Sequence, residues 1–265
     1  RKSPQIYQVE FLGMFGNTGS SVYDEFNDSL ILPLSAFVGS DNMGRPAMQF
    51  YDFAIGIDIG LSDGEGKKIK IGKNEDATKK VRAATTMSLC AVTSDLEKMV
   101  VIDEYYHSNN AADNTCNTDD RENLGLPAQA DRIMQYIAKW FDQYGGGSTI
   151  LMNGQVNVYV DSADVGARAV LEMKAREWGF YNLHFFGSTK ISIQSRIDFW
   201  RLMMAYSSFL VCDKCKNLIR EIKNARRGKK GEARADVDDH ILTATEYGFQ
   251  PIIGQLKRWR SFKMH

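Results

Sequence analysis

The sequence has little of several features that would place it in a specialised class. It holds only 4 cysteines among 265 residues, too few and too unevenly spaced for a disulfide framework in a chain of this size. It contains no apolar run long enough to span a membrane and no signal-peptide pattern. These absences favour a reduced, cytosolic globular protein with no membrane partner.

The chain also lacks an excess of charge of either sign, because 33 basic side chains balance 33 acidic ones. The overall charge therefore does not indicate a nucleic-acid partner, and evidence for one must come from local basic patches. The phosphate-binding motif Gly-x-x-x-x-Gly-Lys-Ser/Thr is absent, so this chain is not expected to hydrolyse ATP. What remains is an ordinary globular composition, 43% hydrophobic, with length for a large core.

One cysteine pair has a spacing that metal sites use. Cys212 and Cys215 form a single Cys-x-x-Cys, and a structural zinc ion would need two further ligands from elsewhere. A zinc site at Cys212 and Cys215 therefore stays an alternative, and measuring the zinc content of the purified protein would test it.

The order of apolar patterns predicts a mixed α/β domain. Three strands come first and are joined closely enough to pair as antiparallel neighbours; later strands alternate with helices, as parallel strands do. This order is similar to the RNase H-like fold, a mixed central sheet with helices on both faces. The expected strands span residues 53–60, 83–93, 98–106, 156–161 and 183–186, and the clearest helices span 128–144, 192–207 and a last one ending near 249.

Acidic side chains stand late in two of these strands. Asp58 interrupts the apolar run 53–60, and Asp161 ends the strand 156–161. A charged residue inside a buried strand is costly unless it is paired or binds a metal. Because functional groups gather at the carboxyl ends of parallel strands, we expect these two carboxylates to lie close together.

A third acidic cluster opens the last helix. The stretch 236–240 holds three aspartates followed by His240, directly ahead of a run with helical spacing. Taken alone, such acids are typical of a helix start, where they accept hydrogen bonds from free N–H groups and suit the positive end of the dipole. If this helix packs across the strand ends, Asp238 or Asp239 joins the other two carboxylates.

Three carboxylates brought together suit hard divalent cations. Without a cation, like charges raise one another's pKa values. Oxygen ligands at this density are those that Mg²⁺ or Mn²⁺ prefers. Two such ions, roughly 3.5–4 Å apart, can activate water on one side of a phosphodiester and stabilise the leaving oxygen on the other. The sequence thus favours metal-dependent phosphodiester chemistry.

Local basic patches supply candidate contacts to nucleic acid. They lie in a glycine- and lysine-rich loop or hairpin at 62–80, in the run 223–234 and at 257–260. Such contacts go mainly to phosphates, which predicts strong salt dependence and little sequence specificity. The individual candidates, each with a solvated surface role as the alternative, are Lys67, Lys68, Lys190, Arg196, Arg226, Arg227, Lys229 and Lys230.

Several motifs, in order along the chain, resemble those of bacteriophage large-terminase nuclease domains. The resemblance covers nearly the whole chain, and the ordered set is more specific than any one motif. The matching stretches are Val158-Tyr-Val-Asp-Ser-Ala-Asp164, Ser188-Thr-Lys-Ile-Ser-Ile, Arg196-Ile197, Cys215-x-Asn217-Leu218-Ile219-x-Glu221 and Asp236-x-Asp238-Asp239-His240-x-x-x-Ala244-x-x-Tyr247.

The resemblance implies a DNA endonuclease of the RNase H-like, or retroviral integrase, superfamily that cleaves concatemeric viral DNA during packaging. Its two divalent ions would be held by Asp58, Asp161 and a third acid. His240 is a candidate for orienting a ligand or shuttling a proton, with a histidine on the helix surface as the alternative. Many members carry an acid where this chain has Thr243. That departure leaves the third ligand open between Asp238 and Asp239, with Asp239 favoured. Glu104 and Asp164 are candidate outer ligands.

The resemblance also implies a division of the chain. Residues 1–50 would be a linker or extension from an absent ATPase motor domain, 51–250 the nuclease domain, and 251–265 a tail. A start at Arg1, without methionine, fits an excised domain. The implied partners are double-stranded DNA, the motor domain, the small terminase subunit and the procapsid portal, in the host cytoplasm.

Two other functions stay open at the level of sequence. One is another RNase H-like nuclease, of the resolvase or ribonuclease H type, which cleavage of an RNA–DNA hybrid would reveal. The other is a non-catalytic DNA-binding or portal-docking module whose acids are structural, which would never nick DNA.

Overall fold

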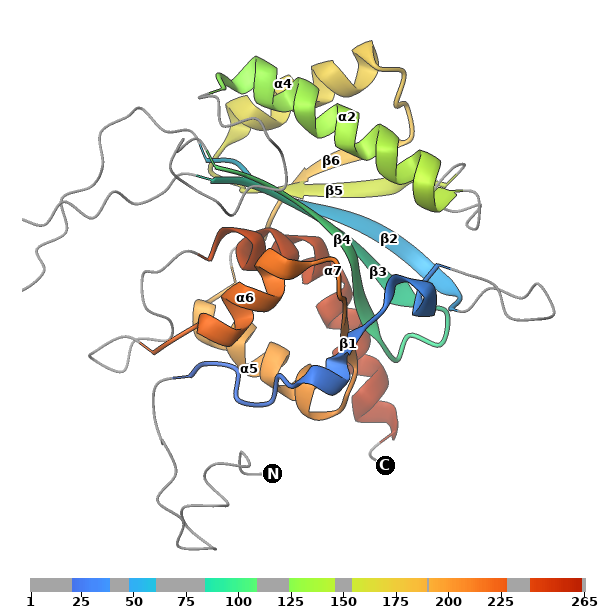
Figure 1. Cartoon of the computed structure of the whole chain (residues 1–265). Coiled ribbons are helices and arrows are strands. Elements are labelled where there is room, and N and C mark those ends of the chain that lie inside the picture. The colour runs from blue at the N-terminus through green and yellow to red at the C-terminus, as the bar shows by residue number, and fades with distance from the viewer. Residues whose placement is uncertain are drawn as a thin grey trace, which may run out of the picture.

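The computed structural model describes residues 21–38, 48–60, 84–108, 124–145, 154–189, 191–227 and 239–263, with only the backbone after Pro251. Within these ranges, a seven-stranded mixed sheet has the order β1-β7-β4-β3-β2-β5-β6 and forms the centre of the molecule (Figure 1). The basic segment 62–80 and residues 1–20 lie outside the described residues.

The middle of the sheet follows the predicted order. Strands β2 (Phe50–Asp58), β3 (Ala84–Thr93) and β4 (Met99–Ser108) pair antiparallel. Strand β5 (Val156–Val160) then pairs parallel with β2, and β6 (Leu183–Gly187) pairs parallel with β5. The predicted mixed sheet is therefore confirmed.

Two further strands complete the other side of the sheet. Strand β7 (Phe209–Cys212) pairs parallel with β4, and β1 (Ile31–Leu32) pairs parallel with β7. The pattern did not predict them, because two to four residues are too few to show the alternation of a strand.

Part of the segment 1–50 packs onto the sheet. Residues 21–38, expected in a linker, contain β1 and the short 3-10 helices η1 (Asp28–Leu30) and η2 (Leu34–Ala36). Val22, Leu30 and Phe37 are at most 1% exposed and belong to the hydrophobic core. Because their apolar side chains are spaced without a helical or strand period, only the packing reveals that this segment is part of the domain.

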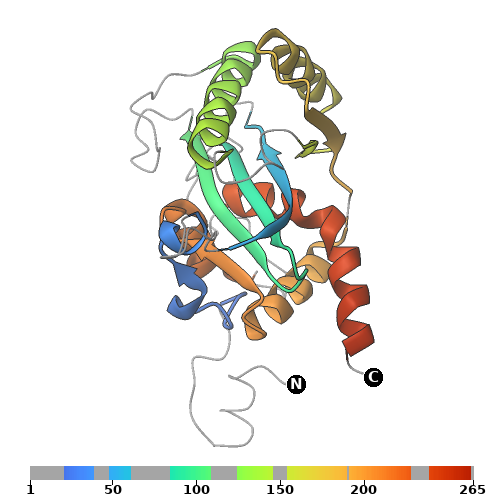
Figure 2. The same ribbon diagram turned by 90° about the vertical axis from the view of Figure 1, so that its right-hand side faces the viewer.

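Helices cover both faces of the sheet, as predicted (Figures 1 and 2). One face carries α2 (Leu126–Gly145) and α4 (Val165–Glu177). The opposite face carries α5 (Ile193–Ala205), α6 (Lys216–Asn224) and α7 (His240–Lys263). In the described part of the chain, no helix combines the length and apolar character needed to cross a bilayer.

Helix α7 is longer than its sequence predicts. The pattern predicts an end near residue 249 and a separate tail from 251, but the helical backbone continues through Pro251 to Lys263. Proline removes one helical hydrogen bond without forcing the chain to stop, and here the helix continues beyond it.

Candidate metal site at the strand ends

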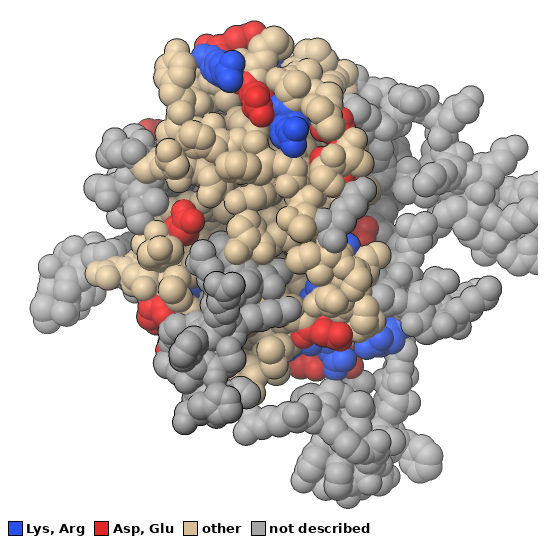
Figure 3. Space-filling model, turned by 180° about the vertical axis from the view of Figure 1, so that it is seen from behind, with Lys and Arg blue, Asp and Glu red and all other residues tan. Residues whose placement is uncertain are grey.

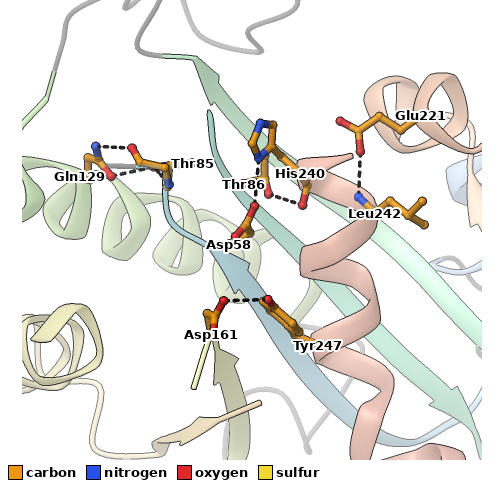
Figure 4. A network of polar contacts seen from close by, with 10 residues as sticks. Asp58, Thr85, Thr86, Gln129, Asp161, Glu221, His240, Leu242 and Tyr247 are labelled. Atoms are coloured by element: carbon orange, nitrogen blue, oxygen red, sulfur yellow. Dashed lines mark hydrogen bonds and ion pairs between the residues drawn. The ribbon is translucent and has the colours of Figure 1, made fainter. Parts of the chain in front are cut away.

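Asp58 and Asp161 stand at the same edge of the sheet. The parallel register of β2 and β5 pairs Ile57 with Val160, and each aspartate is the next residue along its chain. The expectation that the two carboxylates lie on neighbouring strand ends is therefore met in the structure (Figure 4).

Helix α7 packs directly against the strand that carries Asp58. A Cβ atom added at Gly56 of β2 would lie 1.8 Å from the carbonyl oxygen of Ala244 and 2.6 Å from the amide nitrogen of Gly248. A Cβ at Gly248 would in turn lie 2.8 Å from Cys90 Sγ. Only glycines allow this contact between the backbones of helix and strand, and the contact brings the start of α7 over the strand ends.

Three hydrogen bonds from two neighbouring elements fix the first turns of α7. From β3, Thr86 Oγ1 donates to the carbonyl oxygen of His240 at 2.9 Å, and Ser88 Oγ lies 2.5 Å from Thr245 Oγ1. From α6, Glu221 Oε2 accepts a hydrogen bond from the Leu242 amide at 2.9 Å. Because Thr86 is the register partner of Asp58, these bonds place the helix start beside that carboxylate.

Each strand-end carboxylate contacts a side chain of α7. His240 Nδ1 lies 3.1 Å from Asp58 Oδ2, and the Tyr247 hydroxyl donates to Asp161 Oδ2 at 3.1 Å (Figure 4). The other oxygen of Asp161, Oδ1, accepts from the backbone amide of Ala163 at 2.8 Å. The helix therefore orients both carboxylates.

The electrostatics of Asp58 link the three acidic positions. Its side chain is about 21% exposed, and burial raises its pKa above the ordinary value. The hydrogen bond and charge of His240 lower that pKa, whereas the negative charges of Asp239 and Asp161 raise it. Asp239 is thus within electrostatic reach of Asp58, and a cation among these carboxylates would relieve their repulsion.

The donor chemistry fits a hard divalent cation, since the three positions offer carboxylate oxygens around a largely buried member. Among the described residues, however, no three His, Cys, Asp or Glu side chains are already grouped closely enough to hold a metal ion. Two carboxylate oxygens are instead engaged by His240 and Tyr247. The sheet and α7 thus bring the acidic positions to one edge, where His240 and Tyr247 orient two of the carboxylates.

The other predicted residues divide into several groups. Arg196 forms a largely buried ion pair with Glu246 of α7, so its guanidinium faces a carboxylate at the edge of the site. Arg226 donates to the backbone carbonyls of Lys223 and Ala225 at the end of α6. Arg227 is half-buried next to it. Outside the described residues lie Asp238, Lys67, Lys68, Lys190, Lys229 and Lys230.

The two candidate outer ligands have structural partners. Glu104 is buried and accepts hydrogen bonds from the Asn217 amide, the Asn217 side chain and the Leu218 amide, so it caps the start of α6. Asp164 caps α4 by accepting from the Ala167 amide. Both carboxylates cap helix starts in this structure, and a role for either as an outer ligand stays a prediction.

The Cys-x-x-Cys pair belongs to the core. Cys212 ends β7 and Cys215 precedes α6, both fully buried, and burial raises the pKa of Cys212 to about 11. No zinc-binding group forms around the pair within the described residues.

Two residues beside the site had no role assigned from the sequence. Tyr247 lies seven residues after His240 and therefore on the same face of α7, a signal that the helical spacing contains. Glu221 approaches from another helix, and no local pattern relates it to the acids.

Burial raises the pKa of Glu221 to about 8, with the Leu242 hydrogen bond and His240 acting in the opposite direction. The unfolded carboxyl titrates near 4.5, so the contribution of this group to folding stability is fully present below that pH and is lost as the pH rises through about 8. We expect Glu221→Gln, which cannot ionise, to melt several degrees above wild type at pH 9 and close to it at pH 4.5. Thermal unfolding of both proteins from pH 4.5 to pH 9 measures this difference in melting temperature. A difference that is the same at every pH would contradict the prediction.

No known family description and no curated protein matches the sequence. Among solved structures, the large terminase of a thermophilic bacteriophage, in complex with ADP, is similar, with a TM-score of 0.57 at 16% identity over 94% of this chain and 48% of that chain. The P22 large terminase nuclease domain has a TM-score of 0.50 at 11% identity over 89% of this chain and 97% of that one. The chain has the fold of a large-terminase nuclease domain.

The terminase nuclease comparison confirms the RNase H-like architecture predicted from the order of strands and helices. The chain spans about half the length of the terminase from the thermophilic phage and nearly all of the P22 nuclease domain.

Proposed function

We propose that this chain is a divalent-metal-dependent endonuclease that cleaves concatemeric viral double-stranded DNA during genome packaging. The observation that carries the proposal is the meeting of Asp58, Asp161 and the start of α7 at one sheet edge. The terminase nuclease fold supports the same function.

In this proposal Asp58, Asp161 and Asp239, with Asp238 as the alternative, hold two Mg²⁺ or Mn²⁺ ions. When bound, the ions supply an activated water and a charge that stabilises the leaving oxygen. The chain's own side chains hold the ligands in place. His240 orients Asp58 through Nδ1, and a proton on that nitrogen lets it donate to the ionised carboxylate. Tyr247 and the Ala163 amide fix the two oxygens of Asp161.

The proposal extends to the packaging complex. The partners would be an ATPase motor domain, the small terminase subunit and the procapsid portal, in the host cytoplasm. The sequence has no phosphate-binding motif of its own, so the energy for packaging would come from the motor.

The first test uses purified chain, supercoiled plasmid and Mn²⁺. The proposal expects nicked and linear plasmid with Mn²⁺, none with a chelator, and little cleavage of an RNA–DNA hybrid of the same length. Efficient cleavage of the hybrid would favour a ribonuclease H-type enzyme instead. Wild type that never nicks plasmid would favour the non-catalytic DNA-binding or docking module.

DNA binding by this neutral chain is expected to depend strongly on salt. On the face shown in Figure 3, the described Lys and Arg side chains lie beside Asp and Glu side chains and form no broad basic surface, so we expect the phosphate contacts to come from local patches. For roughly three to four phosphate contacts, raising salt from about 50 to 200 mM weakens binding by roughly 40- to 150-fold. Fluorescence anisotropy with two duplexes of unrelated sequence measures this; a large difference between the duplexes would contradict phosphate-dominated binding.

Replacing Tyr247 by Phe removes one hydroxyl and the hydrogen bond to Asp161. The substitution leaves the Asp161 carboxylate in place but no longer holds it in one orientation. We therefore expect metal affinity to fall by roughly 10-fold or more and the fold to be retained. The Mn²⁺ concentration that gives half-maximal cleavage measures this shift. Tyr206→Phe, on the exposed end of α5, is the matched control and should leave that midpoint unchanged.

A further inference from the structure

Glu221 is a buried acid, and only one of its two carboxyl oxygens has a hydrogen-bond partner among the described residues. Its residue is only 4% exposed, and Oε2 accepts the Leu242 amide hydrogen of α7 at 2.9 Å. Oε1 is buried and has no hydrogen-bond partner among the described residues. Burying a carboxyl with an unpaired oxygen is costly, as its raised pKa of about 8 also indicates. Because burying this carboxyl is unfavourable, packing alone does not explain an acid at this position.

The hydrogen bond of Glu221 ends on the turn that carries two site residues. Leu242 follows His240 by two positions and Asp239 by three, in the first turn of α7. Amides in a first helical turn have no partner within the helix, and a side chain just before the helix usually supplies one. Here the acceptor comes from α6 instead, which ties the start of α7 to a second helix (Figure 4).

The opposite side of the same turn is held by the sheet. Thr86 of β3 donates to the His240 carbonyl at 2.9 Å, and Thr86 is paired with Asp58 across the β2–β3 ladder. The first turn of α7 is therefore held between α6 and the strand beside Asp58. Losing either bond would let the turn shift relative to Asp58.

We propose that Glu221 is a positioning residue for the candidate metal site, which fixes the first turn of α7 so that Asp239 and His240 face Asp58. This inference rests on the proposed nuclease function. Glu221 contacts neither metal nor DNA in this proposal, and it acts only through its hydrogen bond to the backbone of α7.

The test compares Glu221→Ala, Glu221→Gln and a matched control in the full chain. Gln keeps an oxygen that accepts the Leu242 amide, whereas Ala removes it. Glu25→Ala is the control, because Glu25 is another largely buried acid, but its partner is Arg201 of α5 and not the backbone of α7. Three quantities are measured: the Kd for Mn²⁺ by titration, the midpoint of thermal unfolding, and kcat and KM for plasmid nicking.

We expect Glu221→Ala to raise the Mn²⁺ Kd at least 10-fold and lower kcat 10- to 100-fold, with KM for DNA within 2-fold of wild type. Glu221→Gln should stay within 3-fold of wild type in both. Glu25→Ala should lower the unfolding midpoint and leave the Mn²⁺ Kd unchanged. If Ala prevents folding, Glu221→Asp, whose carboxylate is withdrawn from Leu242 by one methylene, should show the same direction of change.

The failures of the two proposals are distinguishable. A folded Glu221→Ala or Glu221→Asp variant with wild-type Mn²⁺ Kd and kcat overturns the positioning role and leaves the nuclease function standing. Wild type that binds Mn²⁺ but never nicks DNA overturns the nuclease function, and the Mn²⁺ Kd of the variants then decides on Glu221 alone.

Discussion

Replacing Asp161 by Asn is expected to abolish Mn²⁺-dependent plasmid nicking without unfolding the protein. Asn keeps the size of the side chain and an oxygen for the Ala163 amide, but it loses the charge that a metal ion needs. We expect the cleavage rate to fall by about 10³-fold, which corresponds to ~4 kcal/mol of activation free energy. Asp58→Asn should have the same effect on cleavage, and its unfolding midpoint should not fall, because burial already disfavours the charged form of Asp58.

The control for these substitutions is an aspartate on the other face of the sheet. Asp131 of α2 is partly exposed and paired with Lys174 of α4, so Asp131→Asn removes a carboxylate without touching the site. It should nick plasmid at the wild-type rate. If Asp58→Asn and Asp161→Asn both nicked plasmid as fast as this control, the carboxylates would not be metal ligands.

Gly56→Ala is expected to damage both stability and cleavage, although it adds only a methyl group. The new Cβ would lie 1.8 Å from the carbonyl oxygen of Ala244, and a backbone atom cannot rotate away as a side chain can. Helix α7 would have to move off β2, and overpacking of this kind costs about 1–3 kcal/mol or more. Because the same helix carries His240 and Tyr247 and directly follows Asp239, we expect cleavage to fall by at least 100-fold.

Urea unfolding and plasmid nicking of Gly56→Ala measure these two effects. Gly166→Ala in α4 is the matched control, since its Cβ would meet only Asp164 Oδ1, at 3.9 Å. Replacing a helical glycine by alanine without a clash stabilises by up to ~1 kcal/mol, and it should leave cleavage unchanged. If Gly56→Ala were as stable and active as Gly166→Ala, α7 could not pack on β2 as described.

The sheet was largely predictable because its central strands are long and strongly apolar. Asp58 and Asp161 stood out for the same reason, as charges at the ends of buried runs. Strands β1 and β7 and the packing of residues 21–38 were not predictable, because each is short and its partner is far away in the sequence. Their stability comes from tertiary contacts that no local pattern encodes.

Of the candidate site, only the acidic residues could be predicted from the sequence. The sequence contains Gly56 and Gly248, but nothing in it says that they meet; that contact fixes the rotation of α7 and hence which residues face the strands. Glu221 belongs to a third element; it ends one of the matching motifs, but its contact with α7 was not predictable for the same reason. The choice between Asp238 and Asp239 stays a prediction, since Asp238 lies outside the described residues.

A crystal of the chain soaked in Mn²⁺ tests the central claim most directly, because anomalous scattering locates the ions without assumptions about the ligands. We predict peaks between Asp58 and Asp161, with a third ligand from Asp239 or Asp238 and Tyr247 still bonded to Asp161. Peaks only at other places, in crystals of protein that nicks plasmid with Mn²⁺, would contradict the account.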